Sequence, residues 1–241
     1  MLLERAVTAE ALDELAPGDP RARRSRRDLR RIHRVMGSIS WLRQAVARLR
    51  LARPPARVIE LGAGDGTLML RLARALRPHW SGVALTLLDR QRVVDGGTLE
   101  QFEALGWHAT VVCQDAVEWA RSAPTPQYDL CVTTLFLHHF QDAQLALLLR
   151  AIAGRSGAFI AMEPRRDALA SLGSRLVGLL GANAVTRDDA VKSVAAGFAR
   201  QELTAVWPRA DGGWWTQEFP AWPFSHAFIC ARTHARSVSG P

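Results

Sequence analysis

The sequence predicts an α/β fold in which a mostly parallel, doubly wound sheet of seven strands is closed by an antiparallel hairpin. From residue 56 onward, short apolar runs alternate with amphipathic helical stretches, and this alternation requires right-handed βαβ crossovers and a sheet covered on both faces. Near the end of the chain, two further runs joined by a glycine turn predict the hairpin at one edge of that sheet.

The composition is that of a single globular domain with a small accessory element. The chain has 241 residues, of which 48% are hydrophobic and 22% charged. No apolar run approaches the length of about 18 residues that a membrane span needs, and the first residues lack a signal-peptide core. The three cysteines are far apart and form no C-x-x-C pair, so we expect reduced thiols in a cytoplasmic protein.

Residues 1–54 predict a helical cap in front of the sheet domain. A short helix is expected from Leu3 to Leu15, followed by a longer helical region over residues 24–50 that Gly37 interrupts. The segment from Arg21 to Arg34 contains eight arginines and contributes much of the net charge of +8. Such a segment can bind nucleic acid or an anionic surface, or it can be a solvated helix face. No aromatic residue lies among the arginines to stack on bases, which makes a nucleic-acid partner the less favoured alternative.

Residues 55–232 carry the sheet. The expected strands are Val58–Leu61, Val83–Leu88, Ala109–Cys113, Leu130–Thr134 and Ala158–Met162. Residues 164–197 interrupt the alternation with two helical stretches and are predicted to form a lid. The closing hairpin is expected to use Leu203–Trp207, a turn at Gly212-Gly213 and a last strand over residues 224–231, with a frayed tail at 233–241.

The turn after the first strand has the sequence Glu60-Leu61-Gly62-Ala63-Gly64-Asp65-Gly66-Thr67. Glycines between a strand and a helix let the backbone approach a ligand and direct its N–H groups toward it. Thr67 stands where a dinucleotide-binding turn would have its third glycine, and no Gly-Lys-Ser/Thr of a phosphate-binding loop follows. The acidic Glu60 suits a cationic amino group better than a pyrophosphate.

Acidic residues also follow the next two strands. Asp89 can accept two hydrogen bonds from a ribose diol, and Asp115 can accept from an adenine amine, although an aspartate at this position is also an ordinary helix N-cap. The carboxyl ends of parallel strands meet in one crevice, where open α/β sheets bind their ligands.

The ordered motifs ELGAGDG, LLDR, QDA and YDLCVTTLFLHHF resemble those of class I S-adenosylmethionine-dependent methyltransferases, over residues 55–231. The resemblance implies a Rossmann-like fold and S-adenosylmethionine as the cofactor. It also implies cofactor-binding roles, which fall on Glu60, Gly62, Ala63, Gly64, Gly66, Asp89, Arg90, Asp115, Ala116 and Leu135. The arginine-rich start, the LHHF stretch and the segment from Thr186 are similar to small-molecule methyltransferases of bacterial secondary metabolism.

His139 is the first choice for the general base and His138 is the second. A hydroxyl acceptor must lose a proton, and histidine is suited to accept it near neutral pH. A positioning role for either histidine remains the alternative. No metal site is expected, since only Asp142 accompanies these histidines in sequence.

Six aromatic residues near the predicted lid favour a small aromatic or lipid-like acceptor and O-methylation: Trp41, Trp207, Trp214, Trp215, Trp222 and Phe224. An RNA methyltransferase and a non-catalytic cofactor-binding scaffold are the alternatives, and the sequence predicts neither the acceptor's identity nor the oligomeric state.

Overall fold

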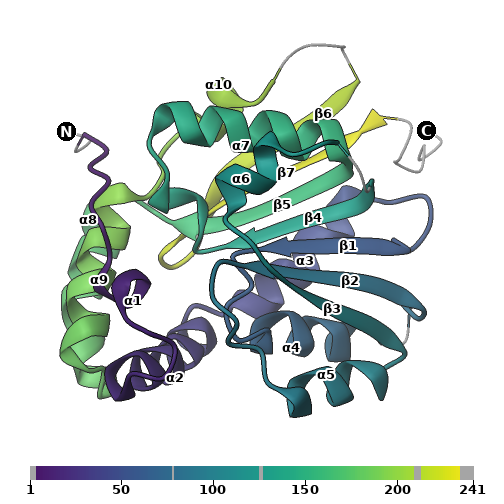
Figure 1. Cartoon of the computed structure of the whole chain (residues 1–241). Coiled ribbons are helices and arrows are strands. Elements are labelled where there is room, and N and C mark those ends of the chain that lie inside the picture. Colours follow the sequence, from purple (N-terminus) through teal and green to yellow (C-terminus); the bar gives the residue numbers. More distant parts are fainter. Residues whose placement is uncertain (1–3, 78, 125–126, 209–212, 234–241) are drawn as a thin grey trace.

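The predicted seven-stranded sheet is present, with strand order β3-β2-β1-β4-β5-β7-β6 (Figure 1). A computed structural model describes residues 4–77, 79–124, 127–208 and 213–233 of the chain. The parallel strands are β1 (Arg57–Leu61), β2 (Val83–Asp89), β3 (Trp107–Cys113), β4 (Tyr128–Thr134) and β5 (Ser156–Pro164). β7 (Ser225–Arg232) pairs antiparallel with β5, and β6 (Trp214–Ala221) pairs antiparallel with β7.

Helices cover both faces of the sheet, as the alternating pattern predicts. One face packs against α3 (Ser38–Leu49), α4 (Thr67–Leu76) and α5 (Gly96–Glu103). The other packs against α6 (Ala116–Arg121), α7 (Asp142–Arg155) and α10 (Glu202–Val206). The two apolar clusters that result lie on opposite sides of the strands. Because the strands are buried on both faces, their sequences are nearly continuous apolar runs.

The remaining helices gather beside the carboxyl edge of the parallel strands (Figure 1). They are α1 (Ala11–Glu14), α2 (Pro20–Val35), α8 (Ala168–Leu176), the 3-10 helix η2 (Val177–Leu180) and α9 (Ala184–Ala196). Gly37, with φ +63°, separates α2 from α3 at the predicted position. In the described part of the chain, no helix combines the length and apolarity that crossing a bilayer would demand. Cys131 and Cys230 are buried and Cys113 is exposed, and all three thiols are free.

The predicted helix from Leu3 to Leu15 is wrong in all but its last turn. Residues 4–10 are not helical, helix α1 begins at Ala11, and Leu3 lies outside the described residues. The segment instead lies against α9, where the Ala6 N–H donates to the Ala195 carbonyl at 3.1 Å. The Arg5 side chain donates to the carbonyls of Ala196 and Phe140 at 2.9 and 2.8 Å. The segment is therefore held by hydrogen bonds to α9 and to the residue after the LHH stretch, rather than by the internal hydrogen bonds of a helix.

The first strand of the predicted hairpin is also wrong. Residues 203–207 belong mostly to helix α10, and the hairpin is made by β6 and β7 with its turn at 222–224. Leu203 and Trp207 are both buried, and their spacing of four residues fits one face of a helix. The predicted turn at Gly212-Gly213 lies partly outside the described residues, as do residues 234–241 of the predicted frayed tail.

A buried contact between a histidine and a glutamate joins the two strands of the hairpin and fastens them to α10. His226 Nε2 on β7 lies 2.7 Å from Glu218 Oε1 on β6, and the two side chains are 1% and 0% exposed. The Glu218 carboxylate also accepts the N–H groups of Leu203 and Thr204 at the start of α10. One carboxylate therefore satisfies an imidazole and two helix N–H donors that have no partner within the helix.

We predict that Glu218→Ala lowers the free energy of unfolding by about 3–5 kcal/mol, because it leaves a buried imidazole and two N–H groups without their acceptor. Chemical denaturation monitored by circular dichroism measures this difference. Gln217→Ala is the matched control on the same strand, since Gln217 is exposed. Equal effects of the two substitutions would contradict the assignment.

Candidate active site

A cavity of about 930 Å³ opens at the carboxyl ends of β1, β2, β3 and β4. It lies where the strand order reverses between β1 and β4, which is the position that ligands occupy in open α/β sheets. All of the predicted cofactor-binding and catalytic residues except Gly66 line this cavity. The upper end of the range for small-molecule sites is about 1,000 Å³, so the cavity has room for a cofactor and part of a second molecule.

Three glycines with positive φ shape the turn after β1. Gly62, Gly64 and Gly66 have φ values of +72°, +54° and +71°. A Cβ atom at Gly62 would overlap the ring of Phe136, and one at Gly66 would lie 3.3 Å from Leu87 Cδ1. Because Gly62 has no side chain, the segment after β4 can pack closely against the turn. Gly66 does not line the cavity and lies at the start of α4.

Glu60, at the end of β1, is a buried acid whose Oε2 atom has no hydrogen-bond partner among the described residues. Burial, together with the nearby carboxylates of Asp65 and Asp89, raises the pKa of Glu60 well above its ordinary value. A buried carboxyl group that is costly to ionise is stabilised in its charged form when a cation binds beside it. The residues at this end of the cavity therefore fit the positively charged amino group of an amino-acid ligand.

Asp89 is held in place by the glycine turn. Its Oδ2 accepts the Gly64 N–H at 2.9 Å, and its Oδ1 accepts the Gln91 N–H at 2.8 Å. Each carboxylate oxygen keeps a second lone pair, so the fixed group can still accept hydrogen bonds from a ligand diol. The neighbouring Arg90 reaches away from the turn, to the carbonyl and the carboxylate of Asp13.

Asp115 serves as the N-cap of α6. Its Oδ1 accepts the N–H groups of Val117 and Glu118 at 2.7 and 3.2 Å, while Asp115 and Ala116 also line the cavity. The helix-cap role and the adenine role that the sequence suggests are compatible, because both hydrogen bonds use the same oxygen. Leu135, at φ +50°, turns the chain sharply after β4 and lines the cavity from the opposite side.

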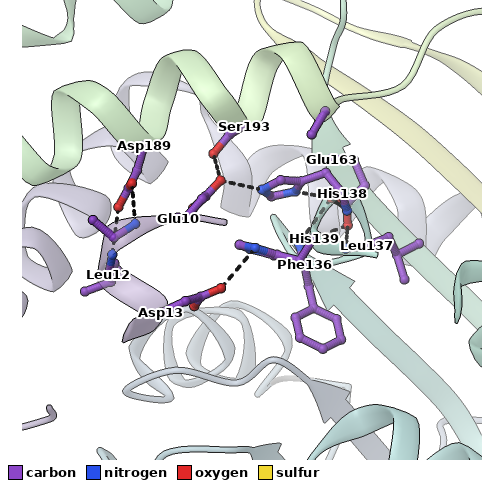
Figure 2. A network of polar contacts seen from close by, with 12 residues as sticks. Glu10, Leu12, Asp13, Phe136, Leu137, His138, His139, Glu163, Asp189 and Ser193 are labelled. Atoms are coloured by element: carbon purple, nitrogen blue, oxygen red, sulfur yellow. Dashed lines mark hydrogen bonds and ion pairs between the residues drawn. The ribbon is translucent and has the colours of Figure 1, made fainter. Parts of the chain in front are cut away.

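His138 is buried between two carboxylates (Figure 2). Its Nδ1 lies 2.8 Å from Glu163 Oε2, and its Nε2 lies 3.3 Å from Glu10 Oε1. Burial alone would lower the pKa of this imidazole, but hydrogen bonds to Glu10 and Glu163 outweigh burial and raise it to about 9. His138 is therefore a cation at neutral pH, with both ring nitrogens used as donors.

Glu163, at the end of β5, organises the segment after β4. Its carboxylate accepts the N–H groups of Phe136, Leu137 and His138, at 3.0–3.4 Å, in addition to the His138 ring. These donors belong to the start of the 3-10 helix η1 (Leu137–His139), whose first N–H groups have no partner within the helix. Glu163 thereby fixes both histidines in space.

His139 pairs with the N-terminal segment. Its Nδ1 lies 3.2 Å from Asp13 Oδ2, and its side chain is 21% exposed toward the cavity (Figure 2). Burial favours the neutral form of Asp13, but the hydrogen bond with His139 outweighs it and lowers the pKa of this carboxyl. With Nδ1 donating to a carboxylate, the other nitrogen, Nε2, carries the lone pair of the neutral ring.

The N-terminal segment is itself tied to helix α9. Asp189 on α9 accepts the N–H groups of Ala11 and Leu12 at 2.7 and 2.9 Å, and Ser193 donates to Glu10 (Figure 2). Sequence reasoning missed Glu10, Asp13 and Glu163. Glu163 carries a signal, since it is a lone acid at the end of an apolar strand, whereas Glu10 and Asp13 reach the site only through tertiary packing.

Glu10, His138 and His139 could also offer ligand atoms to a metal, since one donor atom from each lies within 4.8 Å of the others. The hydrogen bonds to Glu10 and Glu163 already engage both ring nitrogens of His138. Asp142, which accompanies the histidines in sequence, pairs instead with Arg5 at 3.3 Å.

We predict that stability declines between about pH 6.5 and pH 9 as His138 loses its proton. A folded-state pKa above the unfolded value adds stability that is complete below the unfolded pKa and is lost as pH rises through the folded one. The loss is on the order of 3 kcal/mol. Urea denaturation of wild type and His138→Gln across pH 6–10 measures it, and the variant should lack this pH dependence. Parallel curves for the two proteins would refute the assigned ion pairs.

A family model described as a methyltransferase domain matches residues 30–227 of the chain, which include every predicted site residue. No curated protein matches the chain closely enough in sequence to count as a relative.

Several solved structures with a similar fold are methyltransferases. The plantazolicin methyltransferase BpumL, in complex with SAH, is 14% identical, with a TM-score of 0.64 over 92% of this chain and 94% of its own. The mitomycin 7-O-methyltransferase MmcR is 19% identical, with a TM-score of 0.51 over 92% of this chain and 60% of its own. The magnesium protoporphyrin IX methyltransferase of Synechocystis PCC 6803, with bound SAM, is 18% identical, with a TM-score of 0.50 over 89% and 86%.

At these identities the structural likeness establishes the fold, while the family model covers most of the chain. The chain belongs to the methyltransferase domain family and is a class I S-adenosylmethionine-dependent methyltransferase.

Proposed function

We propose that the enzyme methylates a hydroxyl oxygen of a small aromatic or lipid-like molecule, with His139 as general base. The observation that carries this proposal is that two groups line one cavity: the buried Glu60, whose Oε2 has no partner among the described residues, and the His139–Asp13 pair. One end of the cavity suits the cofactor and the other holds a group that can accept a proton. The mitomycin 7-O-methyltransferase, which has a similar fold, methylates oxygen according to its name, and this agrees with a hydroxyl oxygen as the acceptor.

The cofactor roles follow the geometry of the strand ends. Glu60 would receive the amino group, the turn at Gly62, Ala63 and Gly64 would cradle the amino-acid portion, and Asp89 would accept from the ribose. Asp115 and Ala116 would lie beside the adenine, and Leu135 would pack near the cofactor after β4. Arg90 would act indirectly, by holding the N-terminal segment over the site through Asp13. When bound, the cofactor supplies an electrophilic methyl group on a sulfonium.

His139 is arranged to take a proton from an acceptor hydroxyl. Its Nδ1 is held by Asp13, so the Nε2 lone pair can accept the hydroxyl proton while the oxygen bonds to the methyl carbon and the carbon–sulfur bond breaks. Asp13 then stabilises the imidazolium. The products are the methyl ether, the thioether form of the cofactor and a protonated histidine.

His138 has a different proposed role. Because it remains protonated up to about pH 9, it cannot accept a proton at neutral pH. Its ring lies against that of His139, with a centroid distance of 4.2 Å, and its hydrogen bonds join η1 to the N-terminal segment. We therefore assign it as a positioning residue.

The charges around the cavity favour a small molecule over RNA. Besides Glu60, seven acidic side chains line the cavity, against four arginines and the His138 cation: the acids are Glu10, Asp13, Glu14, Asp65, Asp89, Asp115 and Glu118, and the arginines are Arg26, Arg30, Arg90 and Arg121. An acidic crevice repels a phosphate backbone. Within the arginine-rich helix α2, Arg30 pairs with Asp65 at 2.7 Å and Arg26 donates to Gln91 at 2.6 Å, so part of the cluster serves the fold.

The broader setting is part of the same proposal. The free cysteines suit the reducing cytoplasm, and the enzyme's proposed setting is secondary metabolism, in keeping with its similarity in fold to the plantazolicin methyltransferase and the mitomycin 7-O-methyltransferase.

We predict that Glu60→Gln weakens S-adenosylmethionine binding roughly 10- to 100-fold, because a neutral amide loses the charge-assisted contact with the amino group. Wild-type binding should also strengthen as pH rises, since the raised pKa of Glu60 means that binding a cation displaces a proton. Isothermal titration calorimetry measures both effects. Glu100→Gln, at an exposed position on α5, is the control and should bind as wild type does.

We predict that His139→Gln lowers kcat by roughly 10²- to 10⁴-fold while the Kd for the cofactor stays within about twofold. Asp13→Asn should lose part of the rate, because the base would keep its ring but lose its oriented tautomer. The control is His108→Gln, since His108 is exposed on β3 and pairs with Glu103. Single-turnover assays with a phenolic acceptor measure the chemical step, and wild-type rates in His139→Gln would exclude the base.

A further inference from the structure

A second cavity, of about 350 Å³, lies between helix α2 and the lid. Its walls are almost entirely hydrocarbon. The main contributors are Leu29 and Ile32 from α2, Met36 just after it, Leu176 and Leu180 from the lid, and Phe224 from the hairpin turn. The volume falls within the range of about 300–1,000 Å³ found for small-molecule pockets, and the lining is more apolar than such pockets usually are.

The polar side chains in this lining are already used within the protein. Ser25 hydrogen-bonds to Thr186 at 2.7 Å, and Ser174 donates to the Ser171 carbonyl at 2.9 Å. Asp189 accepts the two N–H groups of the N-terminal segment described above. An occupant therefore meets hydrocarbon and satisfied polar groups, which disfavours a peptide or a sugar because their own polar groups would be left without partners.

This apolar cavity adjoins the cofactor cavity. Five residues line both: Glu10, Leu12, Leu29, Leu135 and Ser193. The space beside His139 and the space beneath the lid therefore meet at these five residues. Leu12 belongs to the short helix α1 that also carries Asp13, the partner of His139.

The outer rim of the apolar cavity is exposed to solvent. Leu176, Leu179 and Leu180 are 47%, 83% and 41% exposed, and Val35 on the facing helix is 54% exposed. Large apolar side chains gathered at the mouth of a hollow mark a binding site more often than an idle surface.

We propose that this cavity holds the unbranched alkyl chain of the acceptor, whose polar, methyl-accepting head lies in the cofactor cavity beside His139. This inference rests on the proposed function, since it assigns the acceptor of that reaction to the class of phenolic amphiphiles. An alkyl chain needs no hydrogen bonds, fits a narrow space between helices, and can enter through the exposed leucine rim.

Binding of a homologous series of 4-alkylphenols, from phenol to 4-dodecylphenol, tests the proposal. Calorimetry in the presence of S-adenosylhomocysteine measures affinity without any need for turnover. We expect the Kd to fall by up to roughly fourfold for each methylene buried, and then to level off when the cavity is full. An affinity that does not change with chain length would overturn the proposal.

Two matched arginine substitutions on helix α8 locate the chain. Leu176→Arg places a charge in the cavity and should weaken 4-dodecylphenol binding roughly tenfold or more, with phenol binding unchanged. Leu172→Arg is the control, because Leu172 is on the same helix and is 56% exposed but does not line the cavity. Equal losses of alkylphenol binding in both variants would assign the effect to the exposed face of the lid and overturn the proposal. The proposal would also be overturned if both variants kept wild-type affinity for the alkylphenols but bound phosphatidylcholine vesicles more weakly than wild type.

These outcomes are separable from those that test the proposed function. Chain-dependent binding without methylation of the phenol would contradict O-methylation and leave the alkyl site intact. Methylation of phenol and 4-dodecylphenol with the same KM would support O-methylation and exclude the alkyl site.

Discussion

The arrangement of the active site depends on one buried carboxylate, Glu163. Its carboxylate accepts the first N–H groups of η1, which have no acceptor within that helix, and it also binds the His138 ring. These contacts hold the segment after β4 in place. A negative charge buried at the end of a strand is costly unless it is compensated, and the imidazolium of His138 compensates it. The same imidazolium binds Glu10, and through Glu10 the extended N-terminal segment reaches the site (Figure 2). A chain of charges thus links β5 to residues more than 120 positions earlier in the sequence.

Most of the fold could be predicted because its signals are local. Apolar runs marked the five parallel strands, and the alternate glycines after Glu60 have the positive φ values that a ligand-binding turn requires. The two wrong elements are those whose conformation is decided by distant partners. The segment before Ala11 donates its Ala6 N–H to α9, and residues 202–206 form a helix in which Glu218 accepts the N–H groups of Leu203 and Thr204. Periodicity within a short stretch carries no information about such acceptors.

The candidate site was predictable to the extent that its residues follow strands. The cofactor side meets at one edge because parallel strands bring their carboxyl ends together, so position in the pattern was enough to identify Glu60, Asp89 and Asp115. The acceptor side was not. Of the six aromatic residues expected around the acceptor, Phe224 lines the apolar cavity, whereas Trp207 stacks on Phe159 in the core and Trp41 packs against Phe219. Composition alone cannot distinguish an aromatic residue of the core from one of a pocket.

The residues that line both cavities give the N-terminal segment a mechanical role. Glu10 and Leu12 are two of these residues, and both are hydrogen-bonded to α9, through Ser193 and Asp189. An alkyl chain between α2 and α9 would restrain α9 and, through it, the carboxylates of Glu10 and Asp13. Those carboxylates orient His138 and His139, so contacts made far from the reacting oxygen would align the base. Binding energy from a remote part of a substrate is most useful when it improves the geometry of the reacting groups, and this arrangement provides a direct path for that transfer.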